Sequence, residues 1–363
     1  MRTMIHPAKS VLVLSFCILA GIAIWNAEVF GQQVKEVPLP QTSTQQMDSI
    51  HKILFPETDA AGSVTPANKT GFLERTFLET HNDYQKYSAL FTLSFHYGEQ
   101  QQYGSLLHLL QDGQKQGLFL PFMTGQRTWP GYLEELAKLD GYDELIQKNE
   151  ELREEAQKGA VAEYMVQLPA GYTAEKSYPL LMIFHGGVGS HLNSYYYWQS
   201  PKLQANYIVA YLQGNKVRGS FARSFDENWT AVAQKAYHEI VGKYAVDTTR
   251  VLLGGQSAGG RQSVLLAMEN SIPVSGLILA FPVKPPELDT TRVRAAAERG
   301  MRAAILTGEN DRRFLKGQKE MAVIFDRMGL PNRFVVFPFI GHEFPADFSR
   351  QIGVSLDFVE KAE

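Results

Sequence analysis

The sequence predicts a doubly wound α/β domain with a mostly parallel sheet, preceded by a helical N-terminal segment. From about residue 160 onward, short apolar runs of strand length alternate with stretches in which apolar residues recur at helical spacing. The runs are apolar at consecutive positions, which is typical of parallel strands covered by helices on both faces. Strands and helices that alternate along the chain build a doubly wound sheet.

The expected strands begin with an alternating segment and continue with three fully apolar runs, and two or three more follow. They cover residues 162–169, 179–184, 207–212, 250–254, 275–281, 301–306 and 333–337.

The clearest helix between these strands runs from Trp229 to Val241, where apolar residues recur at i, i+3, i+4 and i+7. Another helix runs from Lys319 to Met328, because Gly329 and Pro331 form a C-terminal stop signal.

The first 31 residues have the pattern of an export signal. Arg2 and Lys9 precede an apolar stretch from Val11 to Trp25 that is shorter than the roughly 20 residues of a membrane span and suits a signal peptide. Small residues allow cleavage after Gly31. We therefore expect an exported protein, periplasmic or secreted, and an uncleaved N-terminal membrane anchor is the alternative.

Three further regions follow the signal. Residues 32–70 are polar and contain several prolines, which predicts a linker-like leader. Residues 71–159 have a helical pattern, and we expect these helices to pack against the flank of the main domain. Residues 160–363 form the predicted α/β domain.

Composition excludes several classes of function. The formal net charge is −3 and no run rich in Lys or Arg occurs, so nothing favours nucleic acid as a partner. The only cysteine, Cys17, lies in the signal-like segment, which leaves no disulfide or thiolate metal site for the rest of the chain. No metal-ligand spacing or phosphate-binding loop is evident, and we expect neither a metal nor another cofactor.

The most informative motif is Gly255-Gln256-Ser257-Ala258-Gly259, a G-x-S-x-G between a predicted strand and a predicted helix. In this context the chain turns sharply, and the serine hydroxyl is presented at the carboxyl end of the strand. The flanking glycines suit a strained turn in which a side chain would collide with its neighbours. Ser257 is therefore the candidate nucleophile.

A serine hydroxyl needs a base to remove its proton, and the base needs a carboxylate to orient it. The strand at 301–306 leads to Glu309 and Asp311, and the strand at 333–337 leads to His342. The chain order of serine, acid and histidine is the one found in α/β enzymes with a serine elbow. We expect His342 as the base and Asp311 as the acid, with Glu309 as the alternative acid.

The oxyanion that forms on the attacked carbonyl needs backbone N–H donors. One candidate is the N–H of Ala258, directly after the nucleophile. The loop His185-Gly186-Gly187 follows the strand at 179–184 and supplies the other, for which Gly187 is preferred to Gly186. His185 is expected to brace this loop.

An aromatic cluster, Tyr195 to Trp198, follows the same loop. Tyr196 and Trp198 are candidates for an aromatic wall that contacts an acyl or aryl group. The alternative is that the cluster packs a helix onto the sheet, as aromatic clusters more often do.

Together these motifs resemble the α/β-hydrolase superfamily. The resemblance covers residues 160–363 and rests on G-x-S-x-G, H-G-G, G-E-N-D at 308–311 and G-H-E-F at 341–344. Segments 166–172, 178–181 and 244–251 are similar to secreted esterases, including feruloyl- and polyhydroxybutyrate-esterase-like enzymes and the phospholipase/carboxylesterase and dienelactone-hydrolase groups.

The resemblance implies a serine esterase that needs no cofactor and acts on a small-molecule or polymeric ester. A peptidase of the same fold is one alternative. Another is a non-catalytic binding protein that acts through residues 71–159. A membrane association is expected only if the N-terminal segment stays uncleaved.

Overall fold

The computed structural model describes residues 33–40, 66–81, 83–120, 132–158, 161–187, 189–213, 229–286 and 288–360. The predicted export signal at 1–31, with Cys17 and the cleavage point after Gly31, lies outside the described residues. Within the described ranges, no helix combines the length and the apolar character that crossing a membrane requires.

The core of the molecule is an eight-stranded sheet with the order β1-β2-β4-β3-β5-β6-β7-β8. Neighbouring strands are parallel except for β2 and β4, which run antiparallel. The strands are β1 (Gln33–Glu36), β2 (Val161–Gln167), β3 (Tyr178–Phe184), β4 (Ile208–Gln213), β5 (Val246–Gln256), β6 (Val274–Ala280), β7 (Arg302–Gly308) and β8 (Asn332–Phe337). Every strand expected after residue 160 is present.

Side chains from alternate positions of each strand enter two different cores, one on each face of the sheet. In β3, Leu180, Met182 and Phe184 join the first core, whereas Leu181 and Ile183 join the second. This alternation follows from the two-residue period of a strand. Both faces are apolar because both are covered by helices.

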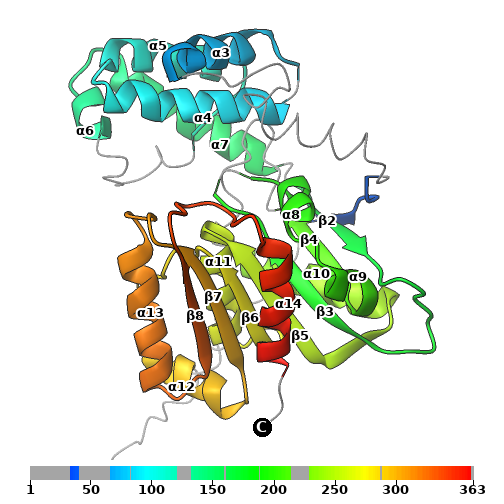
Figure 1. Cartoon of the computed structure of the whole chain (residues 1–363). Coiled ribbons are helices and arrows are strands. Elements are labelled where there is room, and N and C mark those ends of the chain that lie inside the picture. The colour runs from blue at the N-terminus through cyan, green and yellow to red at the C-terminus, as the bar shows by residue number, and fades with distance from the viewer. Residues whose placement is uncertain are drawn as a thin grey trace, which may run out of the picture.

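The helices divide between the two faces (Figure 1). The first core is covered by α10 (Trp229–Lys243), α11 (Ala258–Glu269), α12 (Thr290–Glu298) and α13 (Leu315–Arg327). The second is covered by α8 (His191–Tyr197), α9 (Pro201–Asn206) and α14 (Phe348–Val359). The helices expected at 229–241 and 319–328 correspond to α10 and α13.

Among the described residues between β1 and β2, five further helices share a third core of their own. They are α3 (Pro66–Glu79), α4 (Asp83–Glu99), α5 (Tyr103–Lys115), α6 (Tyr132–Leu136) and α7 (Tyr142–Lys158). Figure 1 shows this group beyond the upper end of the sheet, the end at which β8 runs into the loop before α14.

The start of the predicted linker-like leader is a strand. Gln33–Glu36 forms β1 at the edge of the sheet, and the amide of Val37 extends the pairing by donating to the Tyr164 carbonyl oxygen at 2.9 Å. Glu36 also binds Lys243 at 2.6 Å and the Tyr244 hydroxyl at 2.7 Å. β1 joins the sheet by pairing in parallel with β2, which lies far away in the sequence. The polar, proline-rich composition of the leader gives no sign of such long-range pairing.

The arrangement is the α/β-hydrolase fold that the motifs predicted. A mostly parallel sheet with helices on both faces brings the carboxyl ends of β3, β5, β7 and β8 to one edge. Ligands of doubly wound proteins bind at that edge. The fold alone does not define the reaction, which depends on the residues placed there.

Candidate active site

Ser257 occupies the turn between β5 and α11 in a strained backbone conformation. Its φ is 52° and its ψ is −117°, a positive φ that residues other than glycine rarely adopt. Two backbone hydrogen bonds hold the turn: the Ser257 amide donates to the Ala280 oxygen at 3.1 Å, and the Val283 amide donates to the Ser257 oxygen at 3.0 Å. The serine is thus fixed to the end of β6 as well as to β5.

Gly259 allows the turn to pack against β3. A Cβ on this residue would lie 2.1 Å from the Phe184 carbonyl oxygen, a contact that no side chain can make. The first turn of α11 therefore lies directly on the end of β3. This packing brings the His185-Gly186-Gly187 loop next to Ser257.

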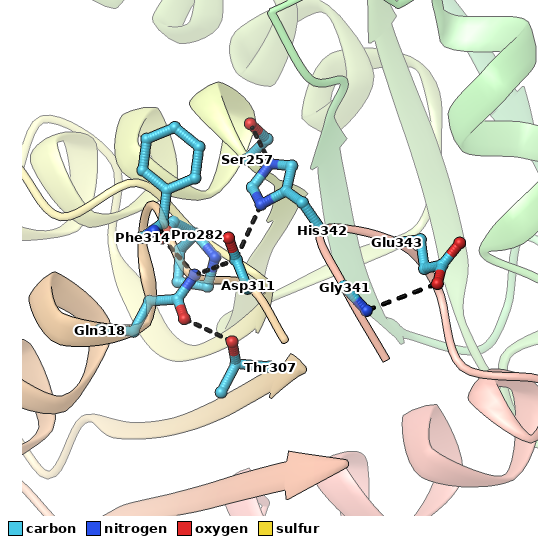
Figure 2. A network of polar contacts seen from close by, with 9 residues as sticks. All are labelled: Ser257, Pro282, Thr307, Asp311, Phe314, Gln318, Gly341, His342 and Glu343. Carbon is cyan, nitrogen blue, oxygen red and sulfur yellow. Dashed lines mark hydrogen bonds and ion pairs between the residues drawn. The ribbon is translucent and has the colours of Figure 1, made fainter. Parts of the chain in front are cut away.

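Ser257, His342 and Asp311 form a continuous hydrogen-bonded chain (Figure 2). His342 Nε2 lies 2.8 Å from Ser257 Oγ, and His342 Nδ1 lies 2.8 Å from Asp311 Oδ2. A carboxylate only accepts hydrogen bonds, so Nδ1 carries the proton and Nε2 is left to accept from the serine hydroxyl. This is the tautomer that a base for Ser257 needs.

Asp311 is almost completely buried, with 2% of its surface exposed. Burial alone would raise the pKa of its carboxyl group. The hydrogen bond from His342 and the positive charge that His342 carries when protonated, with further hydrogen bonds from Gln318 and the Phe314 amide, lower the pKa below its ordinary value. Asp311 is therefore an anion near neutral pH. Glu309, the alternative acid, is exposed, and its carboxylate accepts from the Phe339 amide at 3.4 Å instead of facing His342.

The loops that carry the acid and the base are joined through their backbones. The amide of Asn310 donates to the Ile340 oxygen at 2.8 Å, and the amide of Glu309 donates to the Phe337 oxygen at 2.9 Å. These bonds continue the pairing of β7 and β8 beyond the sheet. The Asp311–His342 distance thus follows from strand pairing.

The two residues that carry the candidate oxyanion donors are neighbours. A Cβ on Gly187 would be 3.7 Å from the Cβ of Ala258, so the loop after β3 runs next to the start of α11. The N–H of Ala258 belongs to the first turn of the helix, where backbone donors have no partner within the helix. Helix N-termini favour negative charge, which suits an oxyanion at this position.

His185 braces the H-G-G loop, as its sequence position suggested. Its Nδ1 lies 2.7 Å from the Gly186 oxygen and its Nε2 lies 3.1 Å from Gln213 Nε2. The carbonyl requires a proton on Nδ1, and Nε2 then accepts from the glutamine amide. Complete burial lowers the pKa of His185 to about 4, so the ring is neutral near pH 7.

Trp198 was a candidate substrate contact, and the structure corrects this expectation. Its side chain has no exposed surface and lies in the core beneath α8 and α14. The indole Nε1 donates to Gln256 Oε1 at 3.2 Å, which ties the cluster to the strand before the nucleophile. Packing, the alternative role of the cluster, therefore applies to Trp198. Tyr196 is only partly buried, and its ring meets that of Tyr197 edge-on at 5.0 Å.

A set of aromatic rings that the sequence did not indicate surrounds His342. The rings of Phe281 and Phe314 each lie with their centroids 4.8 Å from the imidazole. Phe344 contacts Phe281 at 4.9 Å and stacks on Tyr197 at 4.1 Å. The base therefore sits in an apolar environment, although 31% of its side chain is exposed.

Two further residues that the sequence motifs do not include, Gln318 and Thr307, lie behind Asp311 (Figure 2). A signal for Gln318 exists. It lies three and seven residues before Met321 and Phe325, on the buried face of α13. A polar residue on an apolar helix face marks a position where a buried hydrogen bond is required.

In the part of the chain that the structure describes, no group of three or more His, Cys, Asp or Glu side chains is placed to hold a metal ion.

No protein-family model matches the chain, and neither does any curated protein. Solved structures similar to it include an uncharacterized protein from Bacillus cereus, which is 17% identical with a TM-score of 0.48 and for which the match covers 88% of this chain and 99% of that one. A ferulic acid esterase from Anaeromyces mucronatus is 16% identical with a TM-score of 0.42, over 53% of this chain and 83% of that one. An esterase from Thermogutta terrifontis is 16% identical with a TM-score of 0.41, over 55% and 88%. Function is therefore inferred from the geometry of the site itself.

Proposed function

We propose that this protein is a serine hydrolase that cleaves carboxylic esters through an acyl-enzyme intermediate. The observation that carries the proposal is the hydrogen-bonded chain from Ser257 through His342 to Asp311, with both distances at 2.8 Å. A buried anion, a histidine in the required tautomer and a strained serine at a strand end are the parts that this reaction needs.

In the first half of the reaction, Ser257 Oγ attacks the ester carbonyl while its proton passes to His342 Nε2. The N–H groups of Ala258 and Gly187 hold the oxyanion of the tetrahedral intermediate. The intermediate then collapses, the bond to the alcohol oxygen breaks, and the alcohol leaves with the proton from His342. Asp311 orients the ring and stabilises its cationic form.

In the second half, water takes the place of the alcohol. His342 removes a proton from the water as its oxygen attacks the acyl carbonyl of Ser257. Collapse of the second intermediate releases the acid and returns the proton to Ser257 Oγ. The cycle needs no cofactor.

The substrate is proposed to be a small-molecule or polymeric ester with an apolar group next to the scissile bond. This preference is supported by the aromatic rings near the imidazole, those of Phe281, Phe314 and Phe344. An apolar group that packs against these rings is removed from water, which favours its binding. Tyr196 remains the candidate substrate contact from α8.

A fluorophosphonate probe tests the nucleophile, because it reacts covalently with an activated serine. Wild type should be labelled and Ser257→Ala should not. Ser275→Ala is the matched control, since Ser275 lies on β6 and its hydroxyl binds the Val251 oxygen at 3.1 Å. Labelling that survives Ser257→Ala would refute the assignment, and an unlabelled wild type would favour a non-catalytic binding role.

Ester and amide hydrolysis use the same machinery, so a separate comparison distinguishes an esterase from a peptidase. An aryl ester and a peptide anilide with the same acyl group should be offered to the purified protein. We expect kcat/KM to be higher for the ester by several orders of magnitude. A ratio near one would identify a peptidase.

We also propose that the protein is exported by its N-terminal segment. Mature protein recovered from the periplasm or the medium should begin at Gln32 if cleavage follows Gly31. Recovery of the full-length chain in the membrane fraction would identify an uncleaved anchor.

A further inference from the structure

The amide of Gln318 links the candidate acid to two other parts of the site. Gln318 lies on α13 and has no exposed surface. Its Nε2 donates to Asp311 Oδ2 at 3.0 Å and to the Pro282 oxygen at 3.1 Å, and its Oε1 accepts from the Thr307 hydroxyl (Figure 2). One amide thus contacts β7, the loop after β6 and the loop that carries Asp311.

The chemistry of the partners determines the orientation of this amide. Asp311 Oδ2 and the Pro282 carbonyl oxygen only accept hydrogen bonds, so both must face the NH₂ group of Gln318. The remaining amide oxygen faces Thr307, whose hydroxyl is able to donate. A flipped amide would place an oxygen against two acceptors and is excluded by this arrangement.

Gln318 also restricts the carboxylate of Asp311. Oδ2 receives two donors, His342 Nδ1 and Gln318 Nε2, while Oδ1 faces the Phe314 amide at 3.4 Å. A carboxylate that is bonded from several directions cannot rotate without losing a donor, and a buried anion that loses a donor is strongly destabilised. The direction in which Oδ2 points toward His342 is therefore fixed by Gln318.

The bond to Pro282 extends this control to the imidazole. Pro282 follows Phe281, whose φ is 36° and whose ring packs on His342 with the centroids 4.8 Å apart. Phe281 thus has a backbone conformation that residues with a side chain rarely adopt. The hydrogen bond from Gln318 to the oxygen of the next residue, Pro282, stabilises this conformation. The same amide therefore holds the acid behind His342 and the ring beside it.

We infer that Gln318 is a positioning residue for the hydrolytic reaction, holding Asp311 and the loop of Phe281 so that His342 faces Ser257. This inference rests on the proposed function. A residue that only fills space on the buried face of α13 would be replaceable by methionine, which has nearly the same length and shape. Gln318→Met should therefore lower activity if Gln318 positions Asp311, and should leave activity unchanged if Gln318 only fills space.

The test compares Gln318→Met with a matched control, Gln351→Met. Gln351 is also a buried glutamine that donates to a carboxylate, Asp347 Oδ2 at 2.8 Å, but it lies on α14 away from Asp311. Gln318→Met should lower kcat on an aryl ester by about tenfold to a hundredfold with KM changed by less than about threefold, because orientation and not substrate binding is lost. Gln351→Met should leave kcat within about threefold of wild type.

A measurement without substrate accompanies the kinetics. The proton between His342 Nδ1 and Asp311 gives a low-field proton NMR resonance, which His342→Gln identifies by removing it. We expect Gln318→Met to shift or broaden this resonance and Gln351→Met to leave it in place. Thermal unfolding of each variant shows whether it is folded.

Gln318→Glu provides rescue by the nearest analogue. When protonated, the glutamic acid side chain donates a hydrogen bond to Asp311 as the amide does. When ionised, it is repelled by the negative charge of the Asp311 carboxylate. The activity of Gln318→Glu relative to wild type should therefore fall as pH rises, whereas the ratio for Gln318→Met should change little.

Folded Gln318→Met with wild-type kcat and an unchanged low-field resonance would overturn the inference. If Gln318→Met fails to fold, the pH dependence of Gln318→Glu decides, and a flat ratio overturns the inference. If wild type hydrolyses neither esters nor amides and resists the fluorophosphonate, the proposed function fails. The low-field resonance then still shows whether Gln318 holds the Asp311–His342 pair.

Discussion

Gly308 and Ile340 approach so closely that a Cβ on Gly308 would lie 2.2 Å from the Ile340 carbonyl oxygen. Gly308 ends β7 three residues before Asp311, and Ile340 lies two residues before His342. The loop that supplies the acid therefore contacts the loop that supplies the base at Gly308, which has no side chain. The glycine of the G-E-N-D motif is explained by this contact.

Gly308→Ala should separate the two loops and weaken the Asp311–His342 hydrogen bond. We expect a loss of about tenfold or more in the rate of fluorophosphonate labelling, and a free energy of unfolding lower by about 1–3 kcal/mol from overpacking. Urea denaturation measures the second quantity. Gly242→Ala in α10 is the control, because its Cβ would meet nothing within 4 Å. Equal labelling rates for the two variants would contradict the explanation.

Much of this site follows from sequence because each of its parts is attached to a strand end. The serine, the histidine and the H-G-G loop each follow an apolar run, so their placement at one edge requires only parallel pairing. The choice between Glu309 and Asp311 depends on how a short loop turns, which spacing does not reveal. Thr307 had no signal, because a single polar residue in a strand has no pattern of its own, whereas the signal for Gln318 is its place on the buried face of α13.

The stability of the fold should depend on the protonation of His185. Its folded-state pKa is lowered to about 4, whereas an unfolded histidine takes up a proton below about pH 6.5. Between these values the unfolded chain binds more protons, so stability falls as pH falls, by up to about 3 kcal/mol. His185→Gln removes this contribution. The gap in unfolding free energy between wild type and His185→Gln should therefore narrow from pH 6.5 to pH 4, and a constant gap would contradict the burial of a neutral ring.

Trp198→Phe separates a packing role from a substrate contact. The variant leaves the buried Gln256 Oε1 without its indole donor, which should lower the free energy of unfolding by about 1–3 kcal/mol. Because the ring has no exposed surface, KM for an aryl ester should stay within about twofold of wild type. Tyr196→Ala is the comparison: if Tyr196 contacts the substrate, the loss of its ring should raise KM. A large KM effect of Trp198→Phe would restore its sequence-based role.

The helices α3–α7 should be separable from the site, because they share a core distinct from the two cores of the sheet. Replacing residues 41–160 by a flexible linker of about 15 residues should leave fluorophosphonate labelling within about threefold of wild type, since parallel strands need a crossover of about a dozen residues. A four-residue linker is the comparison: with residues 37–40 it leaves fewer than the dozen residues that a parallel crossover normally needs, so it should reduce labelling more than the long linker does. Lost labelling with the long linker would show that the helices support the site, whereas loss of only a partner or surface association would assign them a binding role.

The sheet edge was the least predictable part of the fold. An alternating segment at 162–169 indicates a strand but not its direction, so the antiparallel pairing of β2 with β4 had no signal. The four residues of β1 are too few for a periodic pattern, and their strand partner lies more than a hundred residues away. Long central strands are easy to predict from sequence. Because both of their faces are buried, every position favours an apolar residue, and the strand is recognised as an apolar run.

The parallel pairing of β1 with β2 has a consequence for the intact chain. The helical segment leaves the sheet from one strand and returns through its immediate neighbour, so it is clamped at both ends to a single edge. We therefore expect both halves to stay attached to the sheet after a nick in the backbone of this segment. One half stays held by β1, through its backbone pairing and the anchorage of Glu36 to Lys243 and Tyr244, and the other half continues covalently into β2.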